Sequence, residues 1–249
     1  HGRPALKPLI GQKLIVIAWI WVRTVKSPNP AFSHVEVPLA STFILSSKKG
    51  KEAYVQPVVE DDRYHFIVKE GSPPPEAKKG TKAEGRGSNF LCLISNSPIS
   101  GDYIKTEGKA GRMGTRLMAV VAKIKRGRIY LNPTPEVESV AAEADPTFRP
   151  DSIISGTTQY LGCKPYGMEK FGDLFTPRQL VALTTLSDLV VEVREKIRLD
   201  AVDSGLVEDD QGIDAGGTNA TAMMEAVCLY LAFAVDRCAD FGNSLCGWS

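Results

Sequence analysis

The chain has 249 residues, 43% of them hydrophobic and 24% charged, which is enough apolar material for one sizeable core or two smaller ones. No run of about eighteen uncharged apolar residues occurs, so the sequence predicts no membrane-spanning helix. Five cysteines, an odd number without a disulfide framework, fit a reducing environment, and a cytoplasmic location is expected.

The net charge of +1 hides a strong asymmetry between the two halves of the chain. Residues 1–131 contain 22 Lys and Arg against 10 Asp and Glu, whereas residues 132–249 contain 8 against 19. An imbalance of this size is typical of a first half that faces a polyanion. The alternative is a solvated basic face that the acidic second half of the same chain neutralises, and charge alone leaves both open.

The first half predicts mostly strands. Residues 13–25 form a buried strand or a short helix, and residues 71–88, rich in Gly, Pro and Lys, form a loop. Alternation predicts a strand at 35–46, and β-rich composition predicts strands at 53–59 and 64–69 that form a hairpin turned at residues 60–62. Residues 89–94 are expected to form another short strand. Residues 115–125 and 128–131 read as a second hairpin turned at Arg126 and Gly127, although 116–121 could equally be helical.

The second half predicts helices at 135–144, 176–199 and 219–241, with a long connector at 147–175 and an acidic loop at 200–217. Thr176, Pro177 and Gln179 form a capping pattern at the start of one long helix. Its apolar residues share one face: Leu183, Leu186, Val190, Val193 and Ile197. The helix at 219–241 is apolar almost all round, so it is expected to be buried, packed antiparallel to the first.

These patterns predict an α+β fold. A β-rich, basic first part covers residues 1–132, and an acidic, mainly helical part with two long packed helices covers residues 133–249. The three histidines sit in no catalytic spacing, and no Ser-based elbow or acid pair stands out, so no catalytic residue is predicted.

Four stretches carry a resemblance to a known family. They read WIWVRTVKSPNPAF (19–32), PISGDYIKTEGKAGRMGTRLMAVVA (98–122), GDLFTPRQLVALTTLSDLV (172–190) and LYLAFAVDRCADFGNSLCGW (229–248). In this order they resemble segments of the predicted adenine-specific DNA methylases that contain a zinc ribbon. The resemblance covers nearly the whole chain.

Members of that family carry an S-adenosylmethionine-binding Gly-rich motif upstream of this region and an Asp-Pro-Pro-Tyr catalytic motif downstream. No Asp/Asn-Pro-Pro-Tyr/Phe tetrapeptide occurs here, and the glycines from Gly108 to Gly114 do not follow a buried strand and open a helix. The resemblance therefore implies a middle segment or truncated relative of a methyltransferase. We expect it to be inactive alone, with no cofactor-binding residue and with S-adenosylmethionine bound only by the intact family enzyme.

The resemblance also implies two cysteine knuckles of a zinc ribbon in the first part. Ser27 and Phe32 stand at the ligand positions of the first knuckle, and Cys92 and Ser95 at those of the second. A structural zinc needs four soft or imidazole ligands. The first part is therefore expected to be ribbon-like with degraded knuckles and no metal.

Basic residues are concentrated between 105 and 128, where Glu107 is the one acid. The family places this region between its cofactor and catalytic motifs, a common position for target-recognition inserts, so the resemblance suggests DNA contact. Phosphate-contacting side chains are predicted at Lys105, Lys109, Arg112, Arg116, Lys125, Arg126 and Arg128.

Three functions follow from the sequence. The first is a DNA-contacting segment of an S-adenosylmethionine-dependent adenine methyltransferase, with DNA and the remaining methylase segments as partners. The second is a stand-alone, non-catalytic binding or interaction module that pairs with a separate catalytic chain. The third is an independent enzyme, for which no motif speaks. A membrane partner is not expected.

Overall fold

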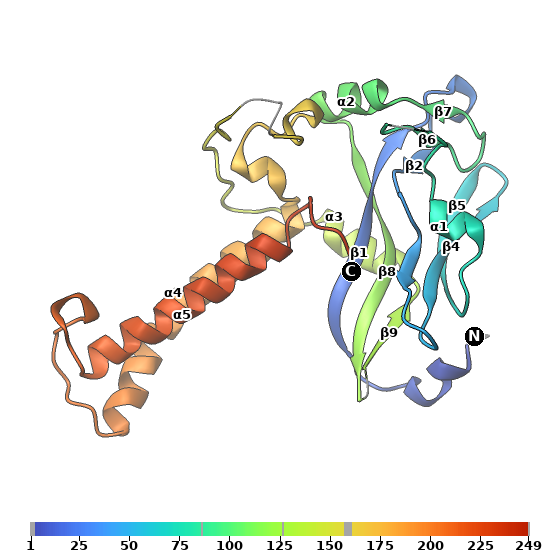
Figure 1. Cartoon of the computed structure of the whole chain (residues 1–249). Coiled ribbons are helices and arrows are strands. Elements are labelled where there is room, and N and C mark those ends of the chain that lie inside the picture. Colours follow the sequence, from blue (N-terminus) through green and yellow to red (C-terminus); the bar gives the residue numbers. More distant parts are fainter. Residues whose placement is uncertain (1–2, 86, 126, 157–160, 249) are drawn as a thin grey trace. The chain divides into compact units, whose positions relative to one another are not determined.

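The computed structural model describes residues 3–85, 87–125, 127–156 and 161–248. The chain divides into two compact units (Figure 1). Unit 1 comprises His1–Val140, Gly156–Met168 and Gly247–Ser249, and unit 2 comprises Ala141–Ser155 and Glu169–Cys246. Unit 1 contains the sheets and unit 2 the two long helices, which confirms the α+β prediction with a β-rich part followed by a helical part.

The larger sheet of unit 1 has the strand order β2-β1-β8-β9, and every neighbouring pair is antiparallel. The strands are β1 (Ile15–Lys26), β2 (Glu36–Pro38), β8 (Gly114–Ile124) and β9 (Gly127–Leu131). Strand β8 is buried without interruption from Leu117 to Ala122. A continuous apolar run suits a strand that is covered on both faces, and this explains why its sequence lacks the period-two signal and could also have been helical.

The second sheet has the order β3-β4-β5, from β3 (Ile44–Ser46), β4 (Ala53–Glu60) and β5 (Arg63–Glu70). Strands β4 and β5 form the predicted hairpin, and Asp61 in its turn has a φ of 55°. A short ribbon joins β6 (Phe90–Leu91) to β7 (Pro98–Ile99).

The two sheets share one hydrophobic core. Val121 of β8, Tyr130 of β9, Val55 of β4 and Phe66 of β5 all belong to it and are less than a tenth exposed. The ring of Phe66 lies 5.3 Å from that of Tyr64 in an edge-to-face arrangement. Side chains alternate between the two faces along β4 and β5, so one side of the hairpin faces the core.

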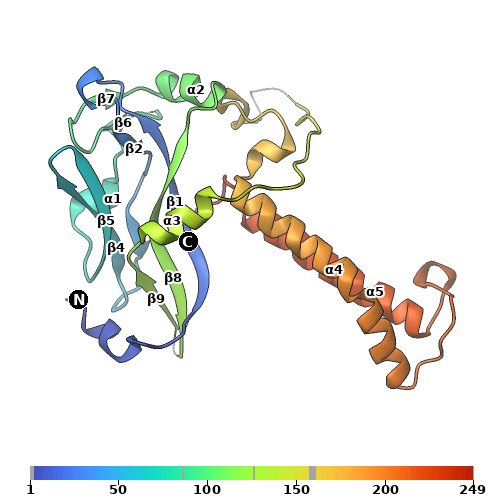
Figure 2. The same cartoon turned by 180° about the vertical axis from the view of Figure 1, so that it is seen from behind.

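The other face of the larger sheet is crossed by α3 (Pro135–Ala142) (Figure 2). The register between β1 and β8 shifts between Ile20 and Trp21. At this irregularity a Glu138 carboxylate oxygen accepts a hydrogen bond from the Leu117 N–H at 2.8 Å and pairs with Arg116 at 3.1 Å. Glu138 thus accepts a hydrogen bond from a backbone N–H of β8 at the point where the strand register shifts.

Two further helices lie in unit 1: α1 (Pro75–Lys79) and α2 (Gly101–Lys109). The prediction of a loop over residues 71–88 is therefore wrong for α1. The Ala77 carbonyl accepts from the Phe43 N–H at 2.7 Å, and the buried Thr81 hydroxyl donates to the Pro38 carbonyl at 2.5 Å. These hydrogen bonds hold residues 75–81 in a defined conformation, although the Gly, Pro and Lys content of the segment predicts a loop.

In unit 2, α4 (Pro177–Asp203) and α5 (Ala220–Phe241) run antiparallel. The Gln179 side chain accepts from the Thr176 N–H at 2.8 Å, and the Asn219 side chain accepts from the Ala222 N–H at 2.8 Å, so both predicted helix starts are confirmed. The Ser244 N–H just beyond α5 donates to the carbonyl of Leu174 just before α4 at 2.8 Å. This bond ties the end of one helix to the start of the other.

The prediction that the helix at 219–241 is buried is wrong. Only Ala220, Ala222 and Met224 of the described α5 residues are buried. One side of α5 packs on α4, and a hairpin of two helices leaves the opposite side uncovered. No helix among the described residues is long and apolar enough to cross a membrane.

Gly80 offers a direct test of how α1 is joined to the sheet. Its φ of 61° and ψ of −133° fall in a region that L side chains avoid, and a Cβ there would overlap the Ala40 carbonyl oxygen and lie 2.8 Å from the Thr42 nitrogen. We expect Gly80→Ala to lower the free energy of unfolding by more than about 3 kcal/mol.

The matched control is Gly50→Ala. Gly50 also has a positive φ, 74°, but nothing lies within 4 Å of a Cβ there, so only the backbone strain of roughly 1 kcal/mol is expected. Urea unfolding followed by tryptophan fluorescence compares the two variants. Equal losses would show that the close approach at Gly80 is not a constraint.

Candidate nucleic-acid interface

The first part of the predicted basic stretch lies on and just after α2. Ser100 caps this helix by accepting from the Tyr103 N–H at 3.2 Å. Lys105 pairs with Asp102 at 3.0 Å, and Lys109 is exposed in the last turn.

Arg112 makes a two-pronged bond to Glu107. Its Nη2 lies 2.6 Å from Oε1 and its Nε lies 3.0 Å from Oε2 of that carboxylate, which is 6% exposed. The hydrogen bonds from Arg112 hold the pKa of Glu107 below its usual value despite the burial that raises it. Arg112 is thus committed to a buried acid of its own chain.

Arg116 is committed in a similar way. Besides its pair with Glu138, its guanidinium carbon lies 5.3 Å from the centre of the Tyr64 ring. Strand β8, which contains Arg116, is eleven residues long in all, roughly 35 Å at the usual rise, and it separates Arg112 from the turn. The structure therefore places Lys105, Lys109 and Arg112 at one end of the sheet and Lys125 and Arg128 at the other.

The turn end of the sheet gathers cations from three separate segments. Register places Lys123 opposite both Ile15 of β1 and Arg128 of β9. The Lys51 ammonium lies 3.5 Å from the position of a Cβ on Gly127, which brings the β3–β4 turn to the same place. We call this group the hairpin-end cluster; it comprises Lys13, Lys48, Lys49, Lys51, Lys123, Lys125 and Arg128, all exposed. Arg126, also predicted to bind DNA, lies outside the described residues.

Arg128 is held by aromatic rings. Its guanidinium carbon lies 4.8 Å from the Trp248 ring and 5.8 Å from the Tyr130 ring. The Trp248 indole N–H and the Tyr130 hydroxyl both donate to the Leu45 carbonyl, at 2.9 and 3.0 Å. The rings orient Arg128 without neutralising it.

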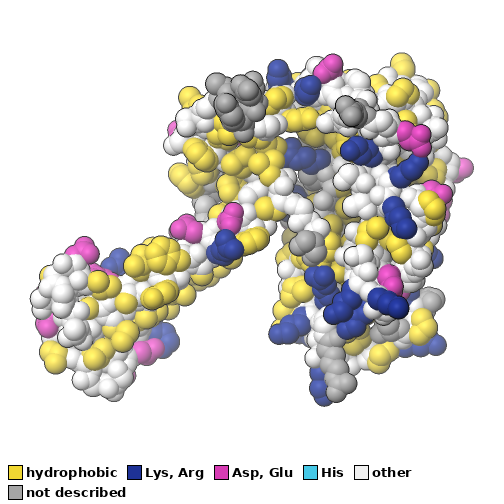
Figure 3. All heavy atoms as spheres, viewed as in Figure 1, with side chains coloured by type: hydrophobic (Ala, Val, Ile, Leu, Met, Phe, Trp, Pro, Cys, Tyr) yellow, Lys and Arg dark blue, Asp and Glu magenta, His cyan; other side chains and the backbone are white. Residues whose placement is uncertain are grey.

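Few acids lie in the segments that form the cluster. Residues 3–15, 46–52 and 123–128 contain a single acid, Glu52. Arg3, Arg112 and Arg116 of unit 1 form ion pairs and are not members of the cluster. Figure 3 shows Lys and Arg side chains gathered over this end of unit 1. The cluster is therefore a positive surface that lies in segments with few acids.

Sequence reasoning missed the larger part of this surface. Lys13, Lys48, Lys49 and Lys51 lie outside the 105–128 stretch, and Trp248 is more than a hundred residues further along the chain. The available signal was the hairpin predicted over 115–131, because its turn must point away from α2. Which other segments meet that turn depends on strand order, which spacing does not reveal.

The knuckle positions do come together, although without a metal-ligand set. Cys92 is 2% exposed, and its thiol has the Ser95 and Ser27 side chains as hydrogen-bonding neighbours. Burial raises the pKa of the Cys92 thiol, but these bonds and those from the backbone of Ser95 and Ile94 outweigh it, so the pKa is lowered overall. The Asn29 side chain also donates to the Ser97 hydroxyl at 3.2 Å.

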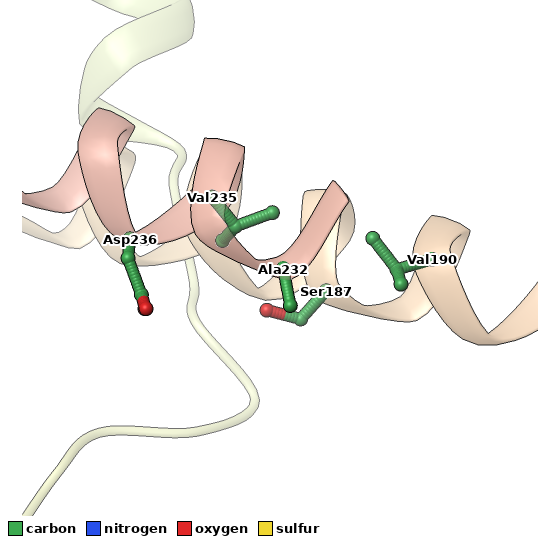
Figure 4. Close-up of a pocket in the computed structure, with 5 residues that line it drawn as sticks. All are labelled: Ser187, Val190, Ala232, Val235 and Asp236. Carbon is green, nitrogen blue, oxygen red and sulfur yellow. The ribbon is translucent and has the colours of Figure 1, made fainter. Parts of the chain in front are cut away.

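Among the residues that the structure describes, no group of three or more His, Cys, Asp and Glu side chains could hold a metal ion. A shallow hollow on the seam between α4 and α5 is lined by Ser187, Val190, Ala232, Val235 and Asp236 (Figure 4). Its volume of about 160 Å³ is below the range of roughly 300–1,000 Å³ that small-molecule sites occupy. We therefore assign no ligand to it.

Comparison with protein-family models, with curated proteins and with solved structures found no match for this chain. The function must accordingly be argued from the surface itself.

The Arg112–Glu107 pair predicts a pH-dependent contribution to stability. The folded-state pKa of Glu107 is lowered, so its contribution is present above the unfolded-state pKa of about 4.3 and is lost as the pH falls through the folded-state value. We expect Glu107→Gln to destabilise the chain at pH 7, with a difference from wild type that shrinks below about pH 4.

Urea unfolding at a series of pH values measures this difference. The control is Asp102→Asn, which removes the exposed partner of Lys105 and should change stability little at any pH. A Glu107→Gln loss that stays constant from pH 7 to the acid limit would contradict an electrostatic origin.

The knuckle positions make a second prediction. Protein prepared without chelator should contain far less than one zinc per chain, because Ser27, Phe32 and Ser95 stand where soft ligands would be required. The variant Ser27→Cys/Phe32→Cys/Ser95→Cys should bind Co²⁺ with the intense thiolate absorption of a tetrahedral site. Metal analysis showing one zinc per wild-type chain would mean that other residues supply the ligands.

Proposed function

We propose that unit 1 binds the phosphate backbone of DNA through the hairpin-end cluster. The chain would act as the DNA-contacting segment of an S-adenosylmethionine-dependent adenine-specific DNA methyltransferase and would be inactive alone. The observation that supports this is the convergence of seven exposed cations from three segments at one end of the sheet. Unit 1 as a whole carries 23 Lys and Arg against 12 Asp and Glu.

Such a surface fits a phosphate backbone for physical reasons. Lysine ammonium groups on flexible stems contact phosphates as point charges, and they carry no base preference. Each neutralised phosphate releases counterions, so binding should weaken steeply with salt. Arg128, oriented by Trp248 and Tyr130, is the one member with a planar guanidinium fixed in place. The choice of DNA among polyanions comes from the family resemblance.

The residues proposed here to contact DNA differ in part from those predicted within residues 105–128. Arg112 and Arg116 are bound to acids of their own chain, and their replacement would expose a buried Glu107 or free the Glu138 that contacts β8. Loss of binding in such variants would therefore confuse folding with contact. Lys49, Lys123 and Lys125 are exposed, and their replacement leaves the Glu107 and Glu138 pairs intact.

The test is a triple variant, Lys49→Ala/Lys123→Ala/Lys125→Ala. We expect weaker binding to duplex DNA of any sequence, and a slope of log affinity against log salt reduced by as much as about 2.7, since each contacted phosphate contributes about 0.9. Fluorescence anisotropy of a labelled duplex at low and moderate salt measures both quantities.

The matched control is Lys78→Ala/Lys82→Ala/Lys109→Ala, three exposed lysines on or near α1 and α2. Both variants lose three positive charges, so an effect of net charge alone would be equal in the two. If the wild-type chain shows no salt-sensitive binding, the proposed DNA contact is wrong. The non-catalytic interaction module is then the function that the chain supports.

A further inference from the structure

The outer side of α5 carries large apolar side chains that nothing in the described chain covers. Five of them, which we call the α5 stripe, are Met223, Leu229, Tyr230, Phe233 and Phe241, exposed by 47%, 51%, 75%, 56% and 63%. At 100° per residue they fall on the side of the helix opposite Met224, Cys228 and Val235, which face α4. The helix therefore has two apolar faces, and one of them packs against α4.

The stripe has the spacing of a helix-packing seam. Met223, Tyr230 and Arg237 are seven residues apart, and Ala226 and Phe233 repeat at the same interval between them. The ten residues from Ala226 to Val235 contain no charge. Single exposed apolar residues are ordinary on a protein surface, but a continuous seam of this kind is not.

Its composition is that of a protein interface. The Tyr230 and Phe233 rings lie 6.4 Å apart in an edge-to-face arrangement, and the Arg237 guanidinium carbon lies 4.1 Å from the centre of the Phe241 ring. Tyr, Phe, Met and Arg are the residues enriched at the centres of such interfaces.

We propose that the α5 stripe binds the α5 stripe of a second copy of this chain, antiparallel, so that two helical hairpins form a four-helix layer. Because the stripe faces away from α4, the two α5 helices lie in the middle of this layer and each α4 lies on the outside.

The exposed area is sufficient for such a contact. An aromatic side chain offers roughly 150–250 Å². At the exposures above, the three rings and the two aliphatic side chains present about 500–600 Å² per copy. Two copies together bury about 1,000–1,200 Å², which reaches the threshold of a specific interface before any polar rim is counted.

The charges of α5 favour the antiparallel direction and a like partner. A parallel pairing would set Arg237 against Arg237 and Asp240 against Asp240. An antiparallel pairing centred between Leu231 and Ala232 sets each Tyr230 beside Phe233 of the second copy and each Arg237 beside Ala226, so that no like charges meet. The polar end of one stripe thus meets the apolar end of the other.

Sedimentation velocity of the full chain under reducing conditions tests the proposal, because reductant removes any disulfide between the exposed Cys238 and Cys246. We expect a reversible monomer–dimer equilibrium, and Phe233→Glu should raise the dimer dissociation constant at least about tenfold. The control is Leu199→Glu, the same substitution at an exposed α4 position, 49% exposed, which should leave the constant nearly unchanged.

The proposal is overturned by a wild-type chain that is monomeric at every concentration, or by a dimer that Phe233→Glu does not weaken. If circular dichroism shows that Phe233→Glu loses helix, Tyr230→Glu at the most exposed position of the stripe decides in its place. A monomer that binds neutral lipid vesicles through the stripe would also overturn it and assign this face to a membrane surface.

Discussion

Burial of β8 on both faces is the constraint on which unit 1 depends. Its inner side chains join the core shared with the second sheet, and its outer side is crossed by α3. A strand buried in this way must satisfy every backbone group, and the Glu138 carboxylate does so for the Leu117 N–H where the register shifts. The same strand separates α2 from the turn between β8 and β9. Its length therefore determines which Lys and Arg side chains of unit 1 lie close enough to contact the same ligand.

Cations in unit 1 fall into two kinds, which differ in what they face. Arg112 and Arg116 each meet an acid that is buried or contacts the backbone, and such pairs hold local structure together. Lys13, Lys48, Lys49, Lys123 and Lys125 of the hairpin-end cluster lie in segments that carry almost no acid. Like charges gathered in this way repel one another, and a bound anion would relieve that repulsion. This contrast, more than the net charge of unit 1, is the basis for proposing that the cluster binds DNA.

Local chemistry was readable from the sequence, whereas tertiary placement was not. The capping pattern at Thr176, the hairpin from Ala53 to Glu70 and the antiparallel helix pair follow from turn residues and periodicity, which act over a few positions. The burial of α5 was predicted wrongly because an apolar helix requires burial but does not reveal whether its own chain supplies the cover. The hairpin-end cluster was missed for the opposite reason: its lysines are separated by up to about a hundred residues, and only strand order brings Lys13, Lys51 and Lys125 together. Ser27 and Ser95 lie near Cys92 in the structure, and the side chains show hydrogen bonding there in place of metal ligands.

The hydrogen bonds around Ser27, Cys92 and Ser95 show how the β6–β7 ribbon is held in unit 1. The Ser27 hydroxyl accepts from the Asn29 N–H at 3.3 Å and bonds to Cys92, while the Ser95 and Ser97 hydroxyls lie 3.0 Å apart. A neutral hydrogen bond contributes about 1 kcal/mol net, whereas a structural zinc contributes roughly 10–16 kcal/mol to the folding of a small domain. A network of this kind can orient two turns but cannot fold them. The turns must therefore rest on the shared core, which reaches them through Cys92 and the fully buried Ile99. A ribbon of two-residue strands persists here because the larger sheets, not the ribbon itself, provide the apolar burial that keeps it in place.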